Sequence, residues 1–67
     1  MRLRGECYQA LGEHQKAIDD FTAYIDKNSG RSEVYEQRAK SYRKLDKEAE
    51  AAYDEARAKV LRTHAQQ

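Results

Sequence analysis

Three side chains have the types that nucleophilic or metal chemistry needs: Cys7, His14 and His64. A nucleophilic cysteine needs a base within hydrogen-bond reach, and neighbours on a helix face lie three or four residues apart. His14 instead follows Cys7 by seven residues and lies beside an expected turn, while His64 belongs to the C-terminal tail. We therefore predict that the protein is not an enzyme, with no catalytic residue, metal site or cofactor. Cys7 is expected to be a small, buried filler of a helical core.

Adjacent carboxylates and isolated glycines are the other features that could carry chemistry. Asp19 and Asp20 form a pair that can serve acid–base or metal catalysis. On a helix such a pair is more often part of a solvated face, and that is the interpretation we adopt. Gly5, Gly12 and Gly30 are isolated in the sequence, so they do not form a glycine-rich phosphate-binding loop.

Basic side chains concentrate in the second half of the chain. Tyr35 and Tyr42 interleave with them, a pattern that can serve nucleic-acid binding. Thirteen basic and twelve acidic residues nevertheless leave a formal net charge of only +1, so no overall field attracts nucleic acid or a membrane. We predict a solvated helical surface and no nucleic-acid or membrane partner, with an RNA-binding helical repeat as an alternative. The basic residues are Arg31, Arg38, Lys40, Arg43, Lys44, Lys47, Arg57, Lys59 and Arg62.

The composition describes one small domain of marginal stability. The 67 residues include nine Leu, Ile, Val or Phe, and the single cysteine excludes an internal disulfide. Five tyrosines and ten alanines supply further compact burial. Such a domain gains from neighbours, either further repeats or a second copy of itself. No apolar run is long enough to span a bilayer and no signal-peptide core is present, so the cytoplasm is the default expectation.

Helical periodicity extends over most of the chain. A first helix is expected over residues 1–11, with Gly5 where another backbone approaches and Gly12 as a C-cap of positive φ. A second helix over 13–27 carries a broad apolar stripe that includes Ala17, Ile18 and Phe21. Asn28 to Gly30 break the pattern, and every residue from 32 onward is compatible with helix up to a frayed tail at 64–67.

An internal repeat of 34 residues relates the two halves of the chain. It pairs Gly5 with Ala39, Tyr8 with Tyr42 and Leu11 with Leu45. With Gly12, Ala17, Phe21 and Tyr35, these residues make the chain resemble the tetratricopeptide repeat (TPR) family over nearly its whole length. The resemblance implies an all-α fold of antiparallel helical hairpins. It implies a first hairpin over residues 1–30, a second unit over 31–63 and a tail over 64–67.

The second copy departs from the first near Asp46, which stands at the position equivalent to Gly12 in the first copy. A small–aromatic–small series at Ala49, Tyr53 and Ala56 indicates a copy two residues short, because the 34-residue offset would place Glu55 in the core. Two alternatives follow: Asp46 caps a fourth helix after a tight turn, or residues 32–62 form one long helix. We favour the long helix, whose exposed seam predicts a paired or domain-swapped homodimer.

The resemblance also implies a groove lined by the first helix of each pair. Its outward positions are Arg2, Glu6, Gln9, Glu33, Glu36, Gln37, Lys40 and Arg43. A carboxylate-binding clamp, which some TPR proteins build there, does not match, because Glu6 and Gln37 stand where asparagines are expected.

We therefore predict a non-catalytic protein–protein interaction module that presents a helix face or shallow groove to a partner peptide or helix. The predicted contacts are Arg2, Glu6, Gln9, Gln37, Lys40 and Arg43. The alternative is a self-associating structural or engineered fragment whose main partner is its own copy.

Overall fold

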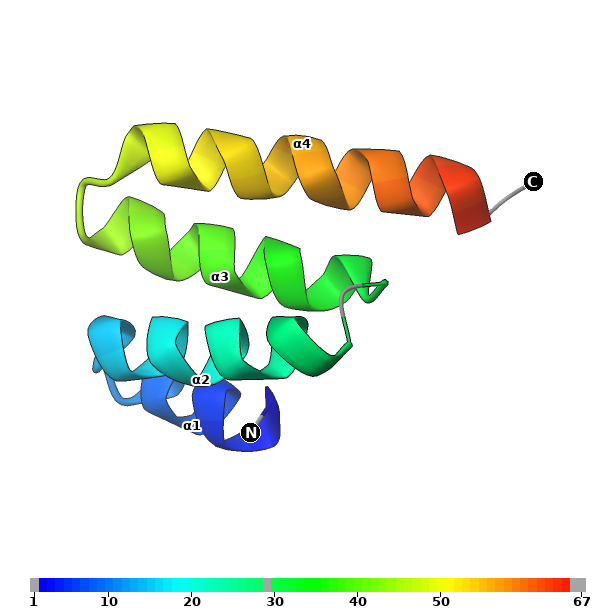
Figure 1. Cartoon of the computed structure of the whole chain (residues 1–67). Coiled ribbons are helices and arrows are strands. Elements are labelled where there is room, and N and C mark those ends of the chain that lie inside the picture. Colours follow the sequence, from blue (N-terminus) through cyan, green and yellow to red (C-terminus); the bar gives the residue numbers. More distant parts are fainter. Residues whose placement is uncertain (1, 29, 66–67) are drawn as a thin grey trace.

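The computed structural model describes residues 2–28 and 30–65, except for the side chains of Arg2, His64 and Ala65. This part of the chain forms α1 (Arg2–Ala10), α2 (His14–Lys27), α3 (Ser32–Lys44) and α4 (Glu48–Ala65). The helices lie side by side in chain order, with α1 and α4 at opposite ends of the stack (Figure 1). The predicted all-α fold class is confirmed. None of the described helices is both long and apolar enough to cross a membrane.

The core lies between the middle helices of the stack. Phe21 and Ile25 of α2 pack with Val34 and Tyr35 of α3, and Ala58 of α4 closes the cluster from the other side. Phe21 and Val34 are fully buried. The apolar stripe of α2 thus packs as its spacing predicts. Partly buried residues that pack against the cluster are Tyr8, Tyr24 and Leu61.

Gly5 lets α1 and α2 approach closely, but the group that fills the space beside it is the Phe21 side chain and not the backbone that the sequence predicts. A Cβ atom added at Gly5 would lie 2.7 Å from Cε1 of Phe21, closer than real Cβ contacts allow. Because the ring of Phe21 is itself fully buried, it has no room to move aside. The equivalent residue 34 positions later, Ala39, is 1% exposed.

The two hairpins turn in the same way. Gly12 has a φ of 82° and Asp46 has a φ of 61°, both in the left-handed region. In the first turn, the amides of Gly12 and Glu13 donate to the carbonyls of Gln9 and Tyr8. The same bonds recur 34 residues later, from Asp46 and Lys47 to Arg43 and Tyr42. This pattern is the Schellman motif, which ends a helix on a left-handed residue.

The prediction of one long helix over 32–62 is therefore wrong. The prediction that the second copy of the repeat is two residues short is wrong as well. Aspartate is one of the few residues other than glycine that adopt the left-handed conformation, so Asp46 makes the turn that Gly12 makes in the first hairpin. The core positions of α4 keep the 34-residue offset, since Ala51 and Ala58 are buried whereas Tyr53 is 65% exposed. Glu55 is exposed, so the 34-residue offset does not place a charge in the core.

The helices are distributed over the predicted ranges as follows. The first hairpin (1–30) contains α1 and α2, and the second unit (31–63) contains α3 and most of α4. Within the tail predicted at 64–67, residues 64 and 65 extend α4, and residues 66 and 67 lie outside the described part of the chain.

Candidate interaction groove

Each hairpin is tied by an arginine–aspartate pair with the same geometry. Nε and Nη2 of Arg4 in α1 donate to the two carboxylate oxygens of Asp20 in α2, both at 2.8 Å. In the second hairpin, Nε and Nη2 of Arg38 donate to Asp54 at 2.8 and 2.7 Å. Such two-bond pairs fix the relative position of the helices that carry them.

The two pairs differ in their exposure to water. Arg4 is 64% exposed and Asp20 10% exposed, whereas Arg38 and Asp54 are 13% and 1% exposed. The hydrogen bonds from Arg4 lower the pKa of the Asp20 carboxyl, and those to Asp54 raise the pKa of Arg38. The expectation that Asp20 is solvated is wrong, because α1 covers it; Asp19 is exposed as predicted.

A groove of about 440 Å³ runs between α3 and α4. Its lining consists entirely of charged side chains: Glu36 and Lys40 from α3, and Glu55, Lys59 and Arg62 from α4. Arg62 and Glu36 form an ion pair that joins the two helices. The groove is thus a charged surface that two different helices build.

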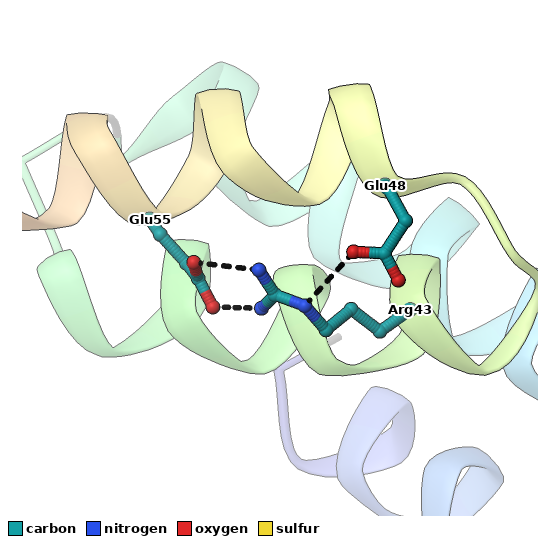
Figure 2. A network of polar contacts seen from close by, with 3 residues as sticks. All are labelled: Arg43, Glu48 and Glu55. Atoms are coloured by element: carbon teal, nitrogen blue, oxygen red, sulfur yellow. Dashed lines mark hydrogen bonds and ion pairs between the residues drawn. The ribbon is translucent and has the colours of Figure 1, made fainter.

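Glu55 is held at the edge of this groove by Arg43. The guanidinium of Arg43 donates to both carboxylate oxygens of Glu55 and, through Nε, to Glu48 at 3.3 Å (Figure 2). The bonds from Arg43 lower the pKa of Glu55. The arginine thus balances the charge of Glu55 from α3.

The 34-residue repeat relates this groove to one that is filled within the same molecule. Glu55 and Lys59 of α4 are the equivalents of Phe21 and Ile25 of α2. Phe21 and Ile25 pack against α3, which lies over the first hairpin (Figure 1). Nothing in the described chain covers α4 in the same way, and the equivalent positions there are exposed and charged. The groove is thus the second hairpin's equivalent of the place that α3 occupies on the first.

The predicted contact residues whose side chains are described do not all gather at one site. The amide of Gln9 donates to the backbone carbonyl of Gln37 at 2.7 Å and to the hydroxyl of Ser41 at 2.9 Å, and so joins α1 to α3. Lys40 lines the groove, and Arg43 joins α3 to α4 beside it. Glu6 is half-buried on α1, and the side chain of Arg2 lies outside the described part. The resemblance assigned two further residues to a groove. Glu36 lines the α3–α4 groove, and Glu33 is exposed at the start of α3.

The 34-residue repeat also relates the ion-pair and groove residues that the sequence analysis did not identify. Arg4 and Asp20 recur 34 residues later as Arg38 and Asp54, which would have marked both pairs as structural. Glu55, Lys59 and Arg62 follow Phe21, Ile25 and Asn28 at the same offset, and only the folded chain shows that α4 is uncovered there.

A second open surface lies on α1. Leu3 and Leu11 are 75% and 74% exposed, and Cys7 and Ala10 between them are exposed as well. The prediction that Cys7 is a buried filler is wrong, because none of the described helices covers this side of α1. On α3 the equivalent of Cys7 is Ser41, which is fully buried under α1 and α2.

Among the described residues, no three His, Cys, Asp or Glu side chains are grouped so that they could hold a metal ion. No protein-family model, curated protein or solved structure matches this chain.

Proposed function

We propose that the protein is a non-catalytic protein–protein interaction module, a TPR-like scaffold segment that binds a partner helix or peptide in the groove between α3 and α4. One observation carries the proposal: the equivalent place on the first hairpin is filled by a helix, α3. A helical element docked on a helical hairpin is thus a packing mode that this chain already uses. The 34-residue repeat of turns and ion pairs supports the TPR-like assignment.

The proposal predicts that helical peptides bind in this groove. Peptides selected from a displayed library of helical sequences would be titrated into the isotope-labelled protein and followed by amide chemical shifts. We expect the largest shifts at Lys40, Glu55 and Lys59. Selection of no peptide, or shifts confined to other surfaces, would contradict the proposal.

A second candidate function, self-association, is favoured by the apolar face of α1. Leucines that are three-quarters exposed favour contact with another apolar surface, and a second copy supplies the same face in a two-fold dimer. The exposed thiol of Cys7 suits a reducing compartment, and we propose the cytoplasm as the location.

Self-association predicts a dimer that depends on α1. Light scattering after gel filtration, with reductant present, should show a dimer at high protein concentration, and Leu3→Ser with Leu11→Ser should return it to a monomer. Val60→Ser is the matched control, since Val60 is 46% exposed on α4 and outside the α1 face. A monomeric wild-type protein at every concentration would rule out this candidate.

A further inference from the structure

Two of the five side chains that line the α3–α4 groove have no counter-charge. Arg43 binds Glu55 and also Glu48, and Arg62 binds Glu36, so each carboxylate of the groove has an arginine partner. Lys40 and Lys59 are exposed and make no hydrogen bond or ion pair with any described residue. The groove therefore presents two unbalanced positive charges, one from each helix.

The charged lining argues against an apolar occupant. On the first hairpin, Phe21 and Ile25 give α3 an apolar surface to pack on. An apolar helix in the α3–α4 groove would instead remove Glu55 and Lys59 from water, and burying a charge without a new partner is costly. An occupant that brings carboxylates avoids this cost, because it supplies a partner to each lysine.

We propose that the groove binds an acidic helix, placed on the second hairpin as α3 is placed on the first, with its carboxylates paired to Lys40 and Lys59. This inference rests on the proposed function and adds the chemistry of the partner. Opposite charges across the contact raise the association rate and fix the orientation of the helix.

Other occupants fit the groove less well. A second copy docked head-to-tail would bring the α1 face of Leu3, Cys7 and Leu11, which offers no carboxylate to the lysines. Nucleic acid binds through many neutralised phosphates, whereas this groove offers two free ammonium groups beside two carboxylates.

The test uses two helical peptides that differ only in charge. Each has the 13-residue length of α3 and a side-chain staple that fixes the helix, and each is acetylated and amidated so that no terminal charge remains. One carries glutamates along a single face, and the other carries glutamines at the same positions. We expect the glutamate peptide to bind more tightly, by an amount that falls as salt rises. Affinities would be measured by fluorescence anisotropy.

Variants of the protein locate the contact. Lys40→Gln and Lys59→Gln should each weaken binding of the glutamate peptide about two- to five-fold, and together about ten-fold, the range expected for exposed ion pairs. Lys47→Gln is the matched control, because Lys47 is exposed in the α3–α4 turn and does not line the groove. It should leave the affinity unchanged, and circular dichroism would verify that all four variants stay folded.

Three results would overturn the inference. Equal affinity for the glutamate and glutamine peptides would remove the role of charge, and an equal loss in Lys47→Gln would remove the role of the groove. Binding of a mixed RNA pool that depends on Lys40 and Lys59, without binding of the acidic peptide, would assign the lysines to nucleic acid. If library-selected neutral peptides still bound at the groove, the proposed function would stand while this inference failed.

Discussion

Asp54→Ala is expected to lower the free energy of unfolding by about 3–5 kcal/mol, the range for breaking a buried ion pair. The substitution leaves the guanidinium of Arg38, only 13% exposed, without its carboxylate between α3 and α4. A loss of this size is a large share of the total stability of about 5–15 kcal/mol that folded domains have. Urea denaturation followed by circular dichroism measures the change.

Asp20→Ala is the matched control for Asp54→Ala. It breaks the equivalent pair of the first hairpin, but Arg4 is 64% exposed and water can solvate it. A smaller loss is therefore expected than at Asp54. Replacing Arg38 and Asp54 together by methionine and leucine should recover stability relative to Asp54→Ala, because no charge then stays buried. Equal losses at Asp20 and Asp54 would show that burial does not set the energy of these pairs.

Phe21→Ala is expected to cost about 3–5 kcal/mol, the usual range for removing a buried phenylalanine. The ring is fully buried, is part of the central core cluster and fills the space above Gly5. Its loss opens a cavity that the three surrounding helices can close only in part. Thermal and urea unfolding would both report the effect.

The Gly5–Phe21 contact makes a second, sharper test of this packing. In the wild-type protein, Gly5→Ala should lower stability, because the clash with the buried ring outweighs the gain in helix propensity of about 1 kcal/mol. In a Phe21→Ala background the same substitution should raise stability, since the ring atoms that it meets are gone. The same sign of change in both backgrounds would contradict the packing described for Phe21.

The first hairpin could be predicted from sequence because its signals are local. Gly12 ends a helix by its own conformational freedom, Gly5 indicates a close approach, and the apolar stripe of α2 has helical spacing. The second turn could not be predicted, because Asp46 is also compatible with a continuous helix. Only the backbone bonds around it, which repeat those at Gly12, distinguish the two cases.

The alignment of α4 with α2 in the repeat could not be predicted, for a different reason. The 34-residue offset was rejected because it assigns Glu55 to the position of Phe21, which is a core position in the first hairpin. In the folded chain, that position is buried only where another helix covers it, and α4 is the last helix of the stack. Whether a repeat position is buried depends on the tertiary neighbour as well as on the repeat.

The candidate groove was predicted only in part. Lys40 was named and lies in it, whereas Gln9 was assigned to a partner and instead joins α1 to α3. The sequence pattern shows which side chains lie on the outward face of a helix. It does not show which of them form hydrogen bonds to other helices of the same chain. Lys59, which completes the groove, is 19 residues from Lys40 and comes near it only through the turn at Asp46.

The order of the helices in the stack has a consequence for folding. Contacts between helices join neighbours in the chain, with a few more between α1 and α3. A topology with such low contact order folds in microseconds to milliseconds, and a chain of this kind can open from its ends without global unfolding. When α1 detaches, α3 and α4 keep their mutual contacts, so local opening at the N-terminus leaves the charged groove assembled.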